Sequence, residues 1–552
     1  MSAKTYIQVI VPLKLDWEPV YYVPEGEKPV VGDRVSVLFS GKEYLAVVSG
    51  TGVTPREGLK EEDILPIIGT DKSLPRISGR ELGFWRTMAQ YYLCTVGEVY
   101  NLVYTIVNNK PPKKWAPKDR SLVASQPALS ASEDAALKKS KEAFGKKKTV
   151  LLYGGGSRVS VFLALASEAI ARGESVMYLV PEIAFSKALE ETVLSVFPDA
   201  AIYNSGLTPA KKRDIVLEAR AGKPMVVLGT RSALWIPFCN LGLIVVDHEQ
   251  EQSFKQDSPA PRFHVRESAI MLGRAFGANV ILGSESPSFE SLYNAETGIF
   301  TGVELNKDFT SSAGSSMVLL DIASERRKRG MVGSFSLKLI GHLKDAVDKG
   351  KKVLAVCPSK ASEEDCRKEL DAIFPGALDK YVFTSSPFAV KTIPEGLYSV
   401  IAILLADVLL GREDFRSDER AVQLFALLSG KTGLLVIQTR EPSHPAFSAS
   451  HQSMMAERRI AGYPPYSRLV SVTLKDIDEG RLNLRSRLLC NRLREVLRPF
   501  SDPLILGPGG GEIRIFFKRD KNLLPGKQAL YREITSFEKQ YSCHVTIDVD
   551  PV

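Results

Sequence analysis

Three consecutive glycines follow an apolar run in the stretch LLYGGGSRVSVF, a pattern that points to phosphate binding. After the first strand of an α/β unit, the backbone amides of a glycine loop and a helix N-terminus can cradle phosphates. The residues at this place are Gly154, Gly155, Gly156, Ser157 and Arg158. A working loop reads G-x-x-x-x-G-K-[ST], because its lysine reaches the β and γ phosphates and its hydroxyl holds magnesium.

Arg158 and Val159 occupy the positions where the lysine and the hydroxyl are required, and the loop is too short. An arginine attracts phosphate but does not replace lysine inside a tight cradle, and a valine cannot bind a metal ion. We therefore interpret this loop as the vestige of a nucleotide site that no longer supports hydrolysis.

An acidic residue ends the apolar run LGLIVVDHEQ, where nucleotide hydrolases place a magnesium-binding carboxylate followed by a residue that orients water. Asp247 takes the first position. His248 takes the second, where glutamate is expected. Because the phosphate loop is degenerate, we interpret Asp247 and His248 as retained architecture and assign no residue a catalytic role.

The elements that position these residues follow an alternating pattern. Short apolar runs are separated by segments of helical composition, which predicts parallel strands covered by helices. The predicted strands of the first set are Val150–Tyr153, Val176–Val180, Val226–Leu228, Ile244–Val246 and Val280–Leu282. A second set comprises Val353–Val356, Val400–Leu405 and Leu434–Ile437. The sequence thus predicts two α/β lobes in tandem.

Smaller units flank the two lobes. The first residues form short strand-like runs broken by proline and glycine, typical of a β-rich domain, and the last hundred residues have a mixed α+β pattern. The predicted boundaries are 1–108 for the β-rich domain, 109–147 for a basic proline-rich linker and helix, 148–300 for lobe 1, 301–447 for lobe 2 and 448–552 for the α+β domain.

The composition is that of an intracellular protein with an anionic partner. The net charge is +8, and lysines and arginines are clustered at three places, which suits a polyanion. The six cysteines form no C-x-x-C pair, so we expect reduced thiols and no metal site. The longest apolar run, Val400–Leu410, is too short for a membrane span and contains Asp407. We expect a cytoplasmic location and no membrane contact.

Several separate motifs are spread over nearly the whole chain. They are PEIAF at 181–185, GTRSALWIPFCNLGLIVVDHEQEQSFKQDSPAPRFHVRESA, GSESPS at 283–288, DFRSDERAVQL at 414–424, VIQTREPSHPA at 436–446, ERRIAGYPPYSRL at 457–469 and the terminal IDVDP. In sequence and in order these motifs resemble one family, the replication-restart helicase PriA, also called primosomal protein N′. The resemblance implies two tandem RecA-like helicase lobes between an N-terminal domain that captures the 3′ end of a nascent strand and a C-terminal α+β domain.

The departures from the family affect its motor. The phosphate loop and the D-E-x-H box are both altered, and the family's Q-x-x-G-R-x-G-R segment appears as ALLSGKTGLL, with Lys431 and Leu434 in place of its arginines. A lysine substitutes in part for an arginine at a γ phosphate, but a leucine does not. The family's cysteine-rich zinc module is expected shortly after Pro358, where this chain runs directly through PSKASEEDCRKEL. Zinc is therefore not expected.

A second group of residues combines basic and aromatic side chains, which suits unpaired DNA. Aromatic rings stack on bases of any sequence, and lysines and arginines follow the phosphates. The predicted DNA-binding residues are Arg231, Phe254, Lys255, Arg262, Phe263, His264 and Arg266. The alternative interpretation is that both phenylalanines pack inside the lobe.

In the N-terminal domain the resemblance implies a shallow pocket for a terminal 3′ nucleotide, with an aromatic and acidic pair ahead of a tyrosine. Here Pro19 and Val20 precede Tyr21, and Trp17 and Glu18 stand earlier, so the pocket is expected to have shifted. The candidates are Trp17, Tyr21, Arg34 and Lys42. The alternative is packing for the aromatic residues and a solvated surface for the charges.

Three functions compete on this sequence. The first is a restart factor that binds forked or single-stranded DNA without ATP-driven unwinding and recruits partners such as single-strand-binding protein and the replicative helicase loader. The second is an active ATP-dependent 3′ to 5′ DNA helicase. The third is a primosome scaffold that no longer binds DNA. We expect no cofactor, and ATP with magnesium only if the degenerate site still binds them.

Overall fold

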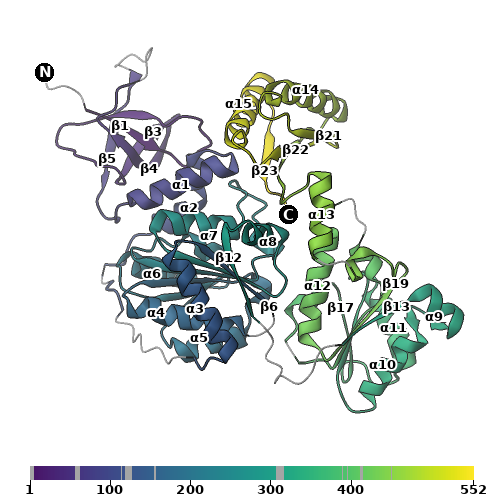
Figure 1. Ribbon diagram of the computed structural model, residues 1–552. Helices are drawn as coiled ribbons and strands as arrows, with labels where there is room; N and C mark the ends of the chain where they lie inside the picture. Colours follow the sequence, from purple (N-terminus) through teal and green to yellow (C-terminus); the bar gives the residue numbers. More distant parts are fainter. Residues whose placement is uncertain are drawn as a thin grey trace.

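The computed structural model describes residues 5–55, 63–113, 115–118, 127–154, 157–305, 316–387, 389–394, 396–410, 414–448 and 451–552. Figure 1 shows four units: an N-terminal one in purple, two larger ones in blue to teal and in green, and a C-terminal one in yellow. All the regular elements named below lie within these residues.

The N-terminal unit is a five-stranded antiparallel sheet in the order β2-β1-β4-β3-β5. Its strands are β1 (Thr5–Ile10), β2 (Val20–Val23), β3 (Arg34–Phe39), β4 (Lys42–Thr51) and β5 (Ile67–Asp71). Two helices follow, α1 (Gly79–Tyr92) and α2 (Val96–Val107), and each begins with a capping box, Ser78 with Glu81 and Thr95 with Glu98. The prediction of a β-rich N-terminal unit is confirmed.

The first parallel sheet has seven strands in the order β12-β6-β11-β10-β7-β9-β8. They are β6 (Thr149–Gly154), β7 (Ser175–Leu179), β8 (Ala201–Tyr203), β9 (Val226–Gly229), β10 (Leu241–Asp247), β11 (Asn279–Ser284) and β12 (Phe300–Leu305). The longer helices around it are α3 (Ala131–Gly145), α4 (Arg158–Ala171), α5 (Lys187–Val196), α6 (Pro209–Arg220), α7 (Val265–Phe276) and α8 (Phe289–Glu296). The sheet includes β12, which begins at the boundary predicted at residue 300.

The second parallel sheet has the order β13-β19-β18-β16-β17. Its strands are β13 (Ser316–Asp321), β16 (Val353–Val356), β17 (Val382–Ser385), β18 (Val400–Ile403) and β19 (Leu434–Thr439). Around it lie α9 (Ile322–Lys328), the short hairpin of β14 (Met331–Val332) and β15 (Phe335–Ser336), α10 (Leu337–Val347), α11 (Glu363–Ile373) and α12 (Ser417–Lys431). The prediction of an α/β fold with two parallel sheets is therefore confirmed.

The C-terminal unit follows α13 (His451–Ala461) and is an antiparallel sheet in the order β21-β22-β20-β23. Its elements are β20 (Ser467–Leu474), α14 (Glu479–Leu497), β21 (Leu504–Gly509), β22 (Glu512–Lys518), α15 (Leu523–Tyr541) and β23 (Val545–Val549).

One hydrophobic core joins three of these units. It contains Trp85 and Tyr100 of α1 and α2, Ile244 of the first parallel sheet, and Val470 and Phe537 of the C-terminal unit. α1 and α2 therefore belong to the packing of the first parallel sheet as much as to the N-terminal sheet. The opposite face of that sheet packs on α3, α4 and α5 in a separate core.

Candidate nucleotide and DNA sites

The predicted phosphate loop connects β6 to α4. Gly154 has a φ of +104°, and a Cβ at this position would lie 2.5 Å from the Leu305 carbonyl oxygen, so the strand end requires glycine. Gly155 and Gly156 lie outside the described residues. Ser157 precedes the helix, and its side chain does not cap it.

Arg158, the first residue of α4, turns into the protein instead of facing a ligand. Its side chain is 6% exposed, its Nε donates to Asp247 Oδ1 over 3.2 Å, and its Nη2 donates to Glu285 Oε1 over 2.8 Å. Asp247 ends β10, and Glu285 directly follows β11. Burial opposes the charge on Arg158, but the two carboxylates outweigh it and raise the pKa of the guanidinium above its usual value.

Asp247 is occupied on both of its oxygens. Oδ1 accepts hydrogen bonds from Arg158 and from the His248 backbone N–H at 2.9 Å, and Oδ2 accepts the Tyr178 hydroxyl at 3.4 Å. His248 has a φ of +54°, and its Nδ1 lies 3.5 Å from Glu285 Oε2. These residues do not fit a magnesium–nucleotide complex, because an internal cation already neutralises the carboxylate that would hold the metal.

Glu285 was missed by the sequence analysis as a member of this cluster. It is the third residue of the quoted motif GSESPS, which begins immediately after the predicted strand Val280–Leu282. Parallel strands end at the same edge of a sheet, and β10 pairs directly with β11, so an acid at this position was a usable signal. Burial acts to raise the pKa of Glu285, but the positive charge of Arg158 lowers it by more, and the pKa falls to about 2.

Lys431, predicted as a remnant of the arginines that reach a γ phosphate, is the last residue of α12. Its Nζ donates to the carbonyl oxygens of Lys391 and Ile393, each over 2.7 Å, within the second sheet unit. Leu434 begins β19. Lys391 in turn reaches across to the first unit, where its Nζ lies 3.2 Å from Glu251. Lys431 thus serves to fix a loop of its own unit.

The two phenylalanines predicted to stack on bases are buried, and that prediction is wrong for this structure. Phe254 is 0% exposed and Phe263 is 1% exposed. Phe263 packs edge-on against Trp235 with ring centroids 5.2 Å apart, and both phenylalanines belong to the core shared with α1 and α7. A ring without exposed surface cannot take a base between itself and solvent.

Lys255 and Arg266 of the same loop are buried as well, and their charged groups bind other parts of the protein. Lys255 Nζ donates to the Val549 carbonyl over 2.6 Å and lies 2.7 Å from Asp548 Oδ1, so it fastens the loop to β23. Arg266 is paired with Glu249 at 2.9 Å and with Glu267. The prediction that Lys255 and Arg266 follow DNA phosphates is therefore also wrong for this structure.

His264 caps α7 from a buried position. Its Nδ1 accepts the Arg266 backbone N–H at 3.2 Å, and its own backbone N–H donates to the Tyr92 hydroxyl at 3.0 Å. Burial is the main cause that lowers the pKa of His264 to about 3, with Arg266 acting in the same direction and Glu267 against it. A buried, neutral imidazole of this kind does not bind phosphate, which corrects the DNA-binding assignment.

Arg231 and Arg262 are the two members of the predicted set that keep exposed surface. Arg231 Nη1 donates to the carbonyl oxygens of Ser253 and Lys255, and Arg262 Nη1 lies 4.0 Å from Asp548. Their role in DNA binding stays a prediction.

In the N-terminal unit, Tyr21 and Arg34 are structural. Tyr21 is 4% exposed, its hydroxyl donates to the Leu38 carbonyl, and burial raises its pKa to about 12. Arg34 is 1% exposed and binds Pro75, Val107 and Asn108, which ties the sheet to the end of α2. Burial lowers the pKa of Arg34 to about 10. Both assignments to a DNA pocket are therefore wrong for this structure.

Trp17 lines a cavity of about 210 Å³, together with Glu18. Trp17 is 37% exposed, and Glu18 Oε2 accepts the Ser49 hydroxyl at 2.5 Å and lies 3.7 Å from Arg86. The cavity lining comprises Val9, Ile10, Val11, Leu13, Leu15, Asp16, Trp17, Glu18, Pro19, Cys94, Thr95, Val96, Gly97 and Tyr531. Lys42, at the start of β4, is exposed and does not belong to this lining.

The contribution of Tyr531 to the cavity could not be predicted, because α15 of the C-terminal unit meets the N-terminal unit only in the folded chain. Thr95 and Gly97 at the start of α2 were missed for the same reason. Glu18 stands beside Trp17 in the sequence, and both residues belong to the lining of this cavity.

Within the described residues, no cluster of three or more His, Cys, Asp and Glu side chains could hold a metal ion. The same residues include no helix that is both long and apolar enough to cross a membrane.

Comparison with known proteins relates the whole chain to one family. Residues 8–105 match the family model for the 3′DNA-binding domain (3′BD) of PriA. The replication restart protein PriA of Rickettsia felis is 25% identical over 96% of this chain and 97% of its own length. PriA of Bacillus subtilis is also 25% identical, over 66% of this chain and 58% of its own. A crystal structure of the DUF1998 helicase MrfA bound to DNA covers 79% of this chain and 65% of its own, at 11% identity and a TM-score of 0.38.

Fold and sequence together define an α/β protein that carries a domain of the 3′-DNA-binding type in front of two parallel sheets. The chain is a homologue of the replication restart protein PriA.

Proposed function

We propose that this chain acts in replication restart by binding forked or single-stranded DNA at stalled forks, without ATP-driven unwinding. Its two parallel-sheet units correspond in this proposal to the tandem RecA-like lobes of a helicase. Support comes from the PriA relationship over nearly the whole chain and from the match of the N-terminal unit to a 3′DNA-binding domain.

The main support for the absence of ATP-driven unwinding is the buried ion pair between Arg158 and Asp247. A hydrolysing site needs that carboxylate for magnesium and the start of α4 for phosphate. Here Arg158, at the start of α4, forms an ion pair with that carboxylate of Asp247. The two groups are 3.2 Å apart, and their side chains are only 6% and 3% exposed. An incoming nucleotide would have to break a buried ion pair before it could bind, so neither ATP nor magnesium is a cofactor in this proposal.

The cavity beside Trp17 is the proposed site for the 3′ end. Its volume of about 210 Å³ is below the about 300 Å³ at which pockets for drug-sized ligands begin, so it has room for part of one terminal nucleotide and not for a longer piece of the strand. Trp17 supplies a partly exposed ring for stacking on the base. Glu18 supplies a carboxylate that accepts a hydrogen bond from a 3′ hydroxyl and repels a 3′ phosphate.

The first experiment decides among the three functions. The purified full chain is titrated with forked and blunt duplexes by fluorescence anisotropy, and DNA-stimulated phosphate release is measured on the same sample. Tighter binding to forks without phosphate release supports the proposal. Stimulated hydrolysis would show an active 3′ to 5′ helicase instead. Equal, salt-independent binding to both DNAs would indicate a protein scaffold, because phosphate contacts release counterions.

The second experiment tests the cavity with oligonucleotides that end in a 3′ hydroxyl or a 3′ phosphate. Stacking contributes about 1 to 3 kcal/mol per base, so Trp17→Ala is expected to weaken binding of the hydroxyl end by about 5- to 150-fold. Glu18→Gln should narrow the preference for hydroxyl over phosphate. Leu38→Ala, an exposed apolar change outside the cavity lining, is the control and should change neither quantity.

Protein partners are proposed from the family relationship. Single-strand-binding protein and the replicative helicase loader are the candidates, and a pull-down with the full chain on a fork, with and without each purified candidate, tests them.

A further inference from the structure

The segment from α9 through the β14–β15 hairpin into α10 carries a concentration of positive charge that the proposed site does not use. Between residues 326 and 344 there are six lysines and arginines and no aspartate or glutamate. The cations are Arg326, Arg327, Lys328, Arg329, Lys338 and Lys344. We refer to residues 326–344 as the basic segment.

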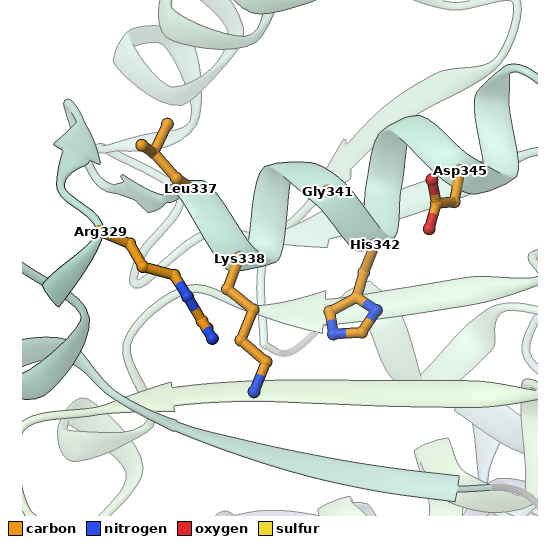
Figure 2. Close-up of a pocket in the computed structure, with 6 residues that line it drawn as sticks. All are labelled: Arg329, Leu337, Lys338, Gly341, His342 and Asp345. Carbon is orange, nitrogen blue, oxygen red and sulfur yellow. The ribbon is translucent and has the colours of Figure 1, made fainter.

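The basic segment borders an open hollow of about 530 Å³. Its lining comprises Arg329, Leu337, Lys338, Gly341, His342 and Asp345. Figure 2 shows that the side chains of Arg329, Lys338 and His342 extend to the same side of α10. Lys338 and His342 are four residues apart on one helix, so they share a face. Asp345 is the one acidic residue of this lining.

Most of these cations have no ion pair with the described part of the protein. Arg329 lies 3.4 Å from Glu325, but within the described part of the chain Arg326, Lys328 and Lys338 have no ion pair. His342 Nε2 is shielded from solvent and has no hydrogen-bond partner there. Buried polar atoms normally have a partner, so this nitrogen is suited to an external group that enters the hollow.

The start of α10, at one end of the hollow, lies near the carboxyl ends of the second parallel sheet. The Ser336 backbone N–H, just before α10, donates to Gln438 Oε1 over 2.9 Å. Gln438 Nε2 donates to the carbonyl oxygens of Ser334 and Leu404, and Gln438 and Leu404 stand at the ends of β19 and β18. Ligands of open α/β sheets bind outside the carboxyl ends of the strands. The position of this surface indicates ligand binding, and its positive charge indicates that the ligand is an anion.

We propose that the basic segment binds the sugar–phosphate backbone of nucleic acid, as a contact on the second sheet unit separate from the 3′-end cavity. This inference rests on the proposed DNA binding and adds to it where an arm of the DNA is held. Arg326, Lys328 and Lys338 neutralise phosphates, and a phosphate oxygen in the hollow gives His342 Nε2 its partner. No base is read, because a backbone contact of this kind carries no sequence information.

The test compares two triple variants of the full chain on the same forked DNA over a range of salt concentrations. The test variant combines Arg326→Gln, Lys328→Gln and Lys338→Gln. The matched control removes the same charge beyond the other end of α10 by Lys349→Gln, Lys351→Gln and Lys352→Gln. All six side chains reach the surface, and thermal melting checks that both variants fold.

Each neutralised phosphate contributes about 0.7 to 0.9 to the slope of log affinity against log salt concentration. Three lost contacts should reduce the slope of the test variant by about 2 to 3. Its affinity is then expected to be at least about 20-fold below wild type at 50 mM salt, with the difference shrinking by about 20- to 40-fold at 200 mM. The control should keep the wild-type slope.

The outcomes separate this inference from the proposed function. If the wild type does not bind forked DNA, the proposed function fails. If the wild type binds and the test variant keeps its slope, the basic segment does not hold DNA, which is also the result expected of a surface for an acidic protein. An equal loss in both variants would show a general charge effect and overturn the inference as well.

Discussion

Removal of the Arg158 side chain tests the central feature of the nucleotide site. Arg158→Met keeps the length of the side chain and deletes its charge, which leaves the Asp247 carboxylate only 3% exposed and without a cation. Breaking a buried ion pair from one side costs about 3 to 5 kcal/mol. Glu285 adds little to this figure, because its side chain is 35% exposed and solvent screens it. We expect the free energy of unfolding of the first parallel-sheet unit to fall by about 3 to 5 kcal/mol.

The assay is urea unfolding combined with hydrogen exchange of β6 and β10, for Arg158→Met, Asp247→Asn and the double variant. Because the two side chains contact each other, the double variant should lose about 0.5 to 3 kcal/mol less free energy of unfolding than the sum of the single variants. Arg158→Lys keeps the charge and should lose less stability, and it should not restore phosphate release while His248, Lys431 and Leu434 remain. A loss below about 1 kcal/mol in Arg158→Met, or phosphate release by Arg158→Lys, would refute the reasoning.

Three further predictions concern the buried charges that join the units. The pKa of His264 falls to about 3 on folding, so the unfolded chain binds the proton more tightly below about pH 6.5. The free energy of unfolding should therefore fall by up to about 1.4 kcal/mol per pH unit below that pH. His264→Asn keeps a capping acceptor, and its unfolding midpoint should change less between pH 6 and 4 than that of the wild type. Lys255→Met removes the 2.7 Å partner of Asp548, which keeps only the 4.0 Å contact with Arg262, and should raise hydrogen exchange in β23 while the N-terminal sheet is unchanged. Arg416→Met breaks a 2.6 Å contact with Glu290 between the two parallel-sheet units, and small-angle scattering should show their separation, unlike the exposed control Lys349→Gln.

Eight of the twelve strands described in the two parallel sheets could be predicted from the sequence with an error of a few residues, and the prediction missed β8, β12, β13 and β17. The predicted strand Val176–Val180 is β7 at Ser175–Leu179, and Val353–Val356 coincides with β16. Such strands are buried on both faces, so an uninterrupted apolar run is their direct signature. The degeneracy of the phosphate loop was equally visible, because it depends on the residue types at adjacent positions.

The predicted DNA-binding loop failed because residue type does not reveal burial. Lys255 pairs with a carbonyl 294 positions away, and Arg34 binds oxygens of Val107 and Asn108 more than 70 positions away. A basic and aromatic stretch has the same composition whether its charges face solvent or distant carboxylates. The sequence indicated the chemistry of these residues, and only the fold determines whether DNA or the protein itself provides the partner.

The same long-range pairing explains why the lobes persist in a chain proposed to have lost its motor. A motor exchanges contacts between its lobes as nucleotide binds and leaves, but here the corresponding groups are paired internally. Glu419 of α12 accepts the Phe289 backbone N–H of the first unit at 2.9 Å and pairs with Arg458 of α13 at 2.7 Å. The first sheet also shares one core with the N-terminal helices and the C-terminal unit, and Tyr531 of that unit lines the proposed 3′-end cavity. Loss of the first sheet unit would expose that core and dismantle the cavity, so selection for DNA binding alone is sufficient to retain that unit.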